Sequence, residues 1–95
     1  WQNAHLLRKG LQALGFDTLG SETPIIPVLV GEDRLVMEFS RRLLERGVYV
    51  QGIRPPTVPE GSARLRLSVS AVHSRDELEL ALKAMGQVGR ELGLI

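Results

Sequence analysis

Cysteine is absent from the 95-residue chain, and aromatic residues are scarce, with one Trp, one Tyr and two Phe. The absence of cysteine excludes disulfides, thiolate metal sites and a cysteine nucleophile, and it is compatible with a reducing compartment. The few aromatic rings and a formal net charge of +1 give no indication of base stacking or of a strong field toward nucleic acid or membranes. The longest apolar run, residues 25–30, is too short to span a bilayer. We therefore expect neither nucleic acid nor a membrane as a partner.

Signals for targeting and for metal binding are lacking as well. No signal-peptide pattern opens the chain, so we expect a cytoplasmic protein. The first residue is Trp1 rather than methionine, which we interpret as processing or as a cut from a longer protein. His5 and His73 show no metal-ligand spacing and no third ligand is evident, so we expect no metal site.

The residues that are present predict a single small domain over residues 1–95, since the length suffices for one core. Apolar residues at helical spacing, and alternating or clustered apolar residues, predict the chain order helix, strand, helix, strand, strand, helix. The segments are residues 3–15, 24–31, 32–47, 48–50 or 48–53, 63–70 and 74–92. This order is typical of a small α+β domain with helices on one face of a mostly antiparallel sheet. We expect residues 1–15 to form a leading helix and residues 16–95 the sheet-and-helix core.

Local signals define several boundaries. Asn3 can cap the first helix, and Ser74 with Glu77 forms an S-x-x-E capping box before the last helix. Pro27 cannot donate to a strand ladder, so it predicts an edge position or a bulge. In the second helix we expect Leu44 on the same side as the residues that face the core.

Two arginines alternate with apolar residues in the last predicted strand. Arg64 and Arg66 therefore point to one face, while Leu65, Leu67 and Val69 point to the other. One interpretation is a solvated face, which is the more common fate of exposed charge. The other interpretation is the capture of a carboxylate or phosphate, for which the planar guanidinium is well suited.

Other polar features have an ordinary interpretation beside a functional one. The proline-rich loop, residues 54–61, is either a rigid connection or a wall of a ligand site, and we favour the rigid connection. His73 is expected to bond locally or to pack, and His5 to be solvated. Lys9 and Lys83 lie within amphipathic helices on solvated faces, so neither is a good candidate for a Schiff base.

Residues 52–82 closely resemble the carboxy-terminal domain of the α-oxoamine synthases, which are pyridoxal-phosphate-dependent enzymes of fold type I. The motifs that carry the resemblance are the "P-T-V-P-x-G" loop of Pro56–Gly61, "A-R-L-R" of Ala63–Arg66 and "S-A-x-H" of Ser70–His73. Residues 21–32 are similar to the first strand of that domain. The loop wording is more similar to 8-amino-7-oxononanoate synthase, and the ending "GQVGRELGLI" is more similar to glycine C-acetyltransferase.

The resemblance implies an activity and a role for single residues. Family members condense an amino acid, such as glycine or alanine, with an acyl-CoA to give an α-oxoamine. They act as homodimers, in biotin biosynthesis or in threonine degradation. The second arginine of the "R-L-R" pattern, here Arg66, binds the carboxylate of the amino acid. Thr57 is a weaker candidate for the same site, and Arg64 is expected to support the domain interface or to be solvated.

The resemblance also implies that most of the enzyme is missing. The family's Schiff-base lysine and its phosphate-binding residues belong to a large domain with no counterpart here. We therefore expect a C-terminal fragment without catalytic or cofactor-binding residues, inactive by itself. Two other interpretations stay open: a free-standing module that binds a small molecule on the polar sheet face, and a structural dimerisation domain.

Overall fold

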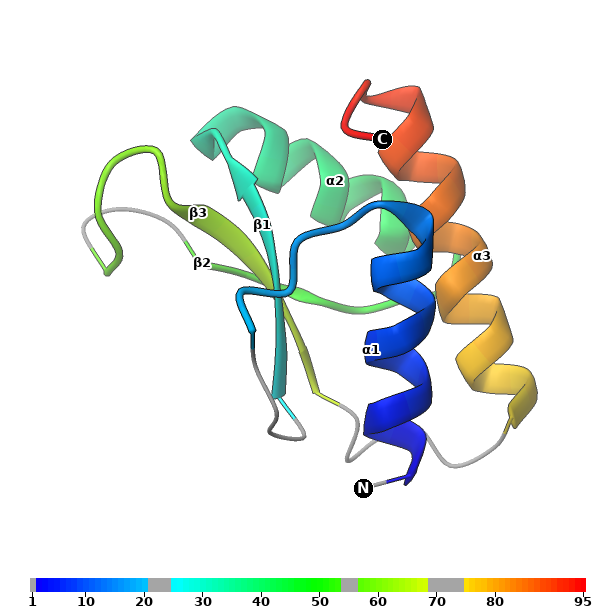
Figure 1. Ribbon diagram of the computed structural model, residues 1–95. Coiled ribbons are helices and arrows are strands. Elements are labelled where there is room, and N and C mark those ends of the chain that lie inside the picture. The colour runs from blue at the N-terminus through cyan, green and yellow to red at the C-terminus, as the bar shows by residue number, and fades with distance from the viewer. Residues whose placement is uncertain (1, 21–24, 54–56, 69–74) are drawn as a thin grey trace.

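The computed structural model describes residues 2–20, 25–53, 57–68 and 75–95, with the side chains of residues 2 and 68 left out (Figure 1). In chain order, the elements are α1 (Gln2–Leu14), β1 (Ile25–Gly31), α2 (Asp33–Glu45), β2 (Gln51–Ile53), β3 (Ala63–Ser68) and α3 (Arg75–Glu91). The three strands form one antiparallel sheet in the order β1-β3-β2. The predicted α+β architecture is therefore confirmed.

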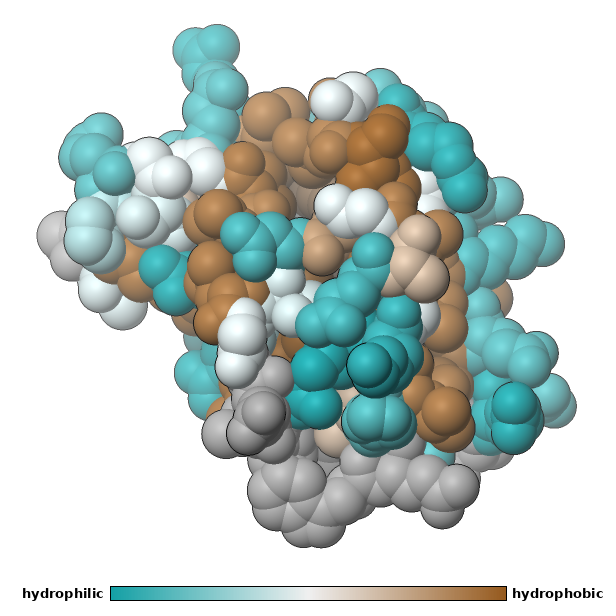
Figure 2. All heavy atoms as spheres, in the orientation of Figure 1, coloured by the Kyte–Doolittle hydropathy of each residue, from teal (hydrophilic) through white to brown (hydrophobic). Residues whose placement is uncertain are grey.

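The helices lie on one side of this sheet (Figure 1). Alternate strand residues point toward them, and Ile26, Val28, Leu65 and Leu67 are each no more than 5% exposed. Helix α2 contacts all three strands, α1 contacts β1, and α3 packs on both α1 and α2. Hydrophilic side chains cover the outward sides of α1 and α3, as their amphipathic sequences predict (Figure 2). The core therefore fills the space between the sheet and the helices.

Helix α2 shows how the periodicity decides which side chains are buried. Val36, Phe39 and Leu43, spaced by three and four residues, are fully buried against the sheet. The prediction for Leu44 is wrong, because its side chain is 60% exposed. Each residue advances about 100° around a helix, so the position after Leu43 already lies outside the buried stripe.

Glycines with a positive φ follow two of the helix ends, whereas the predicted cap of the first helix is not observed. Gly15 and Gly47 have φ values of 108° and 82°, and they follow the ends of α1 and α2. The prediction that Asn3 caps α1 is wrong, because the helix already begins at Gln2. Ala4, only 1% exposed, packs into the core from the first turn, which favours helix on both sides of Asn3. Ser74, of the predicted capping box, lies outside the described residues.

Pro27 lies in an edge strand, as predicted. The amide of Leu29 donates to the carbonyl of Asp17 at 2.9 Å, so alternate amides of β1 point away from β3. Pro27 precedes Leu29 by two residues, so an N–H at this position would also point to the outer edge. The absence of this donor therefore removes no hydrogen bond between β1 and β3. The register is irregular between Leu29 and Gly31, so β1 contains a bulge as well.

Strand β2 covers only the last part of the longer predicted segment, 48–53, and the shorter prediction, 48–50, is wrong. Val50 is buried, and its carbonyl accepts a hydrogen bond from the Ser40 hydroxyl of α2 at 3.3 Å. This contact ties the backbone to α2, and the strand begins only at Gln51. Gly52 follows with its Cα hydrogen toward α2, because a Cβ there would lie 2.8 Å from the Val36 Cγ1.

A second close approach lies at the end of α3. A Cβ on Gly89 would lie 2.6 Å from Cζ of the Phe16 ring, which is itself packed at a tilt against Phe39 with ring centroids 5.9 Å apart. The absence of a side chain at Gly89 thus lets the loop after α1 reach the core. None of the helices in the described ranges is both long and apolar enough to cross a membrane.

Candidate functional site on the open face of the sheet

The side of the sheet away from the helices, hereafter the open face, carries two cross-strand rows that extend over all three strands, beside the pair of Ile25 and Ser68. The first row consists of Pro27, Arg66 and Gln51, and the second of Leu29, Arg64 and Ile53. Directly opposite residues of an antiparallel pair point to the same face, so the members of each row are neighbours. Both arginines lie on β3, the central strand, which is hydrogen-bonded on both sides.

Arg64 is held in place by its surroundings. It is half-buried between Leu29 and Ile53, which are themselves half-buried. Its Nε donates to the carbonyl of Ser62 at 3.1 Å, which directs the guanidinium toward the loop before β3. The amide of Ser62 in turn donates to the carbonyl of Pro59 at 3.0 Å. Arg64 therefore stabilises the entry to its own strand.

Arg66 is presented differently. Its side chain is exposed, and among the described residues it has no side-chain hydrogen bond and no ion pair. Its row neighbours are the Pro27 ring on one side and the Gln51 amide on the other. A central strand restricts the backbone, while the guanidinium keeps its donors available. This is the arrangement that a bidentate contact to a carboxylate or phosphate requires.

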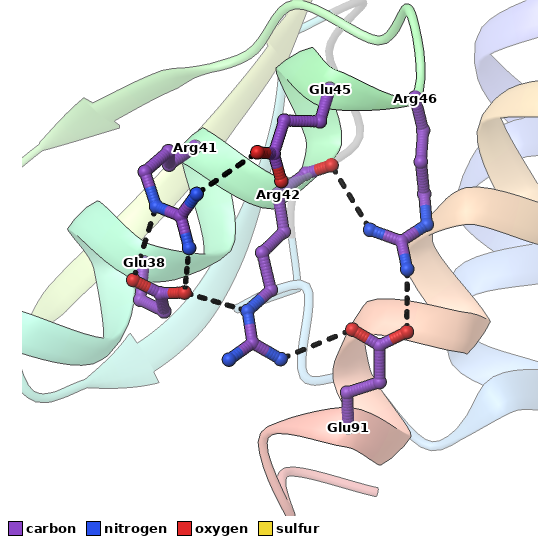
Figure 3. Close-up of polar contacts among 6 residues, drawn as sticks. All are labelled: Glu38, Arg41, Arg42, Glu45, Arg46 and Glu91. Carbon is purple, nitrogen blue, oxygen red and sulfur yellow. Dashed lines mark hydrogen bonds and ion pairs between the residues drawn. The ribbon is translucent and has the colours of Figure 1, made fainter.

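The charge on the open face is of one sign. The two rows contain two arginines and no acidic residue. On the helical side, by contrast, arginines are matched with carboxylates (Figure 3). Glu38 accepts from Arg41 and from Arg42, whose Nε lies 2.6 Å from its Oε2. The open face therefore favours an anion, whereas α2 is neutralised by its own residues.

The carboxylate of Glu38 is strongly affected by this pairing. Hydrogen bonds from Arg41 and then Arg42 lower the pKa of Glu38 to about 2. The same hydrogen bonds, donated to Glu38, raise the pKa of both guanidinium groups. These three side chains are consequently charged over the whole physiological range and serve as a structural network.

Glu91 connects this network to α3 (Figure 3). Its Oε1 lies 3.1 Å from Nη1 of Arg42, and its Oε2 lies 2.5 Å from Nη2 of Arg46. Arg46 also donates to the carbonyl of Arg42 at 3.1 Å, near the end of α2. The contacts join residues more than 40 positions apart and hold the ends of α2 and α3 together.

The other predicted site residues are distributed as follows. Thr57 is exposed in the hairpin loop between β2 and β3, which extends away from α1 and α3 (Figure 1). The loop enters β3 on the side of Arg64, and within the described part of the chain no hydrogen bond joins Thr57 to Arg66. The remainder of the motif loop, residues 54–56, and His73 lie outside the described residues.

Both lysines of the chain lie on helix surfaces. Lys9 and Lys83 are exposed on the surfaces of α1 and α3, as predicted, and neither faces a pocket described for the chain. A surface depression of about 420 Å³ lies along α2, but one helix supplies all of its lining, namely Asp33, Arg34, Met37, Glu38 and Arg41. Over the same described ranges, no group of three or more metal-ligating side chains comes together.

Within the two described rows, Gln51 is a residue with hydrogen-bonding capacity that the sequence pattern did not single out. Nothing in the local pattern distinguishes it from other exposed polar residues. Its significance depends on the register Gln51↔Arg66, which pairs residues from two strands. A strand-pairing signal of this kind is not contained in the periodicity of either segment.

Comparison with known proteins agrees with this picture. A family model described as aminotransferase class I and II matches residues 1–85. An 8-amino-7-oxononanoate synthase from Geobacter sulfurreducens is 56% identical over 99% of this chain and 24% of its own length. A Thermus thermophilus protein, 8-amino-7-oxononanoate synthase/2-amino-3-ketobutyrate coenzyme A ligase, is 52% identical over 100% of this chain and 24% of its own.

A solved structure has the same fold. A serine palmitoyltransferase variant from S. paucimobilis, with a bound aldimine of pyridoxal phosphate and myriocin, has a TM-score of 0.89 and 36% identity. The match covers 100% of this chain and 24% of that one. These relatives confirm the resemblance predicted from the motifs. The chain spans about a quarter of the length of each of them.

Proposed function

The chain belongs to the aminotransferase class I and II family, and from that premise we propose that the protein containing it is a pyridoxal-phosphate-dependent acyltransferase. In this proposal the intact protein condenses an amino acid, glycine or alanine, with an acyl-CoA to give an α-oxoamine. The names of the relatives and their high identity support this class of reaction. We place the protein in biotin biosynthesis, as a cytoplasmic homodimer, with threonine degradation as the other branch to test.

We propose that residues 1–95 are the C-terminal small domain of this enzyme and that Arg66 is its contribution to the site. The observation that carries the proposal is an exposed, unpaired guanidinium on the central strand, in a pair of described rows that holds no acidic residue. Two parallel N–H···O bonds from Arg66 would fix the plane of the substrate carboxylate. A fixed carboxylate fixes the direction of the bonds at the neighbouring α-carbon, which is a positioning effect. Thr57 is the weaker candidate for a contact from the loop.

The cofactor is assigned to the part of the enzyme outside this chain. Pyridoxal phosphate supplies the electron sink that stabilises a carbanion at the α-carbon of an amino acid. Because Lys9 and Lys83 are exposed on helices, the described residues do not fit the role of its anchor. The 95-residue chain alone is therefore expected to show no condensation of amino acid and acyl-CoA.

The test is a substitution of Arg66 in the intact enzyme. Arg66→Ala should raise the KM for the amino acid roughly 30- to 100-fold, since it removes charge-assisted hydrogen bonds to the carboxylate. The KM for acyl-CoA should stay within about twofold of the wild-type value, because the substitution of an exposed side chain is not expected to disturb the fold. Arg34→Ala, an exposed arginine of α2, is the matched control. Unchanged amino-acid kinetics in Arg66→Ala would reject the assignment.

Assays with two acyl donors decide the branch. Pimeloyl-CoA with alanine should be turned over in preference to acetyl-CoA with glycine if the enzyme serves biotin biosynthesis. Preference for acetyl-CoA with glycine would assign the enzyme to threonine degradation instead.

A further inference from the structure

Gln51 is the cross-strand neighbour of Arg66 on the open face. Directly opposite residues of an antiparallel pair have Cβ atoms about 4.5–5.5 Å apart. A glutamine amide and a guanidinium that start at this separation can reach the same small anion. Both side chains are exposed, and the described part of the chain provides neither with a side-chain hydrogen-bond partner.

The other members of the two rows around Arg66 do not offer free hydrogen-bonding groups. Pro27, on the β1 side, presents an apolar ring, and the next row places Leu29 and Ile53 on either side of Arg64. Arg64 itself is engaged with the carbonyl of Ser62. Within the two rows, Gln51 is thus the one group beside Arg66 that has both a free donor and a free acceptor.

The backbone of Gln51 is well anchored although β2 is short. The preceding Val50 is 5% exposed, and its carbonyl is bonded to the hydroxyl of Ser40 on α2. The following Gly52 packs closely against Val36, also on α2. The side chain of Gln51 is consequently projected from a fixed point onto the open face, which lowers the entropy cost of ordering it against a ligand.

We propose that Gln51 is a second binding residue for the carboxylate of the amino-acid substrate. Its amide N–H donates to a carboxylate oxygen that Arg66 also binds, and its amide oxygen accepts from the Arg66 guanidinium. Gln51 would thereby orient the guanidinium and complete a three-point grip on the anion. The inference rests on the proposed role of Arg66 and adds a residue to it.

The test uses two substitutions of Gln51 in the intact enzyme. Gln51→Leu keeps the size and removes the amide, so the KM for the amino acid should rise about fivefold, the value of one hydrogen bond. Gln51→Glu places a carboxylate beside Arg66, which pairs with the guanidinium and repels the substrate, so the KM should rise at least about tenfold. In both variants the KM for acyl-CoA should not change. Gln87→Leu and Gln87→Glu, at an exposed position of α3, are the matched controls.

A double-mutant cycle with Arg66 separates binding from a merely structural effect. In the Arg66→Ala background, Gln51→Leu should raise the KM by less than about twofold, because the shared anion contact is already lost. Additive effects would overturn the inference.

The two proposals fail in different ways. If Arg66→Ala raises the amino-acid KM while both Gln51 variants match their Gln87 controls, only the role of Gln51 is rejected. If Arg66→Ala leaves that KM unchanged, the carboxylate site itself is rejected, and Gln51 loses its assigned partner.

Discussion

Two groups of arginines in this small domain have opposite environments. On the helical side, Arg41 and Arg42 are matched by Glu38, and Arg42 also reaches Glu91. On the open face, Arg64 and Arg66 are accompanied by apolar and amide side chains and by no carboxylate. The first group has its counter-ions within the chain and serves the packing of helices. The second group has no carboxylate partner among the described residues, and in the proposed function the substrate supplies the negative charge for Arg66.

The comparison predicts that stability resides on the helical side and affinity on the open face. Substitutions on the helical side should lower the free energy of unfolding without a selective effect on the amino-acid KM. Substitutions on the open face should do the reverse. Each of the following changes can break or sharpen that division.

The largest effect on stability is expected for Phe39→Ala. This ring is fully buried in α2 and contacts Phe16, so its removal should cost about 3–5 kcal/mol through lost burial and a residual cavity. Urea unfolding of the chain, followed by circular dichroism, measures the loss. A cost below about 1 kcal/mol would mean that the core between sheet and helices is not packed as described.

A smaller loss is expected for Gly52→Ala, at about 1–3 kcal/mol. The new methyl group would meet the Val36 Cγ1 at 2.8 Å, between β2 and α2. Gly20→Ala is the control for the steric contact, because a Cβ at this position would meet no atom within 4 Å. The φ of Gly20 is 70°, so this control variant has backbone strain of its own. The same urea titration compares them. A neutral Gly52→Ala would show that β2 can move away from α2.

The ion pairs should contribute less. Glu91→Gln weakens the contacts to Arg42 and Arg46, and partly exposed pairs of this kind are worth about 0.2–1 kcal/mol each. The loss should shrink in 1 M salt, which screens the charges. An effect that is independent of salt would point to packing rather than to charge.

The pH dependence of stability should reveal Glu38. Its pKa is about 2 in the folded chain, compared with an ordinary value of 4.5, so its contribution is fully present above pH 4.5. The contribution should be lost progressively as the pH falls from 4.5 to 2, when the carboxylate is protonated. The free energy of unfolding, measured between pH 2 and 6, should therefore change less with pH in Glu38→Gln than in the wild type. Identical slopes would contradict the pairing with Arg41 and Arg42.

The smallest effect on stability is expected on the open face. Arg66→Ala should change the free energy of unfolding by less than about 0.5 kcal/mol, because the side chain is exposed and unpaired. Together with a large rise in the amino-acid KM of the intact enzyme, this result would place Arg66 in binding alone. A loss comparable to that of Gly52→Ala would assign it a structural role.

Much of the fold could be read from short-range patterns. The spacing of Val36, Phe39 and Leu43 predicts which side of α2 is buried, and the alternation around Leu65 predicts which side of β3 carries the arginines. Errors arose at the margins of such patterns. Leu44 is one position beyond the buried stripe, and Asn3 lies one residue inside a helix that starts earlier than its cap signal suggests.

The sequence by itself determined the order of the elements and their amphipathic faces. It also contained the motif around Arg66 that resembles a known family. All of these features depend on residues a few positions apart in the chain. Only the tertiary structure decided which arginines are neutralised and which stay free. Arg42 meets Glu91 49 positions away, and Gln51 meets Arg66 through the register of two strands. Such contacts depend on how separate elements pack, and local periodicity carries no information about the partner that packing will bring.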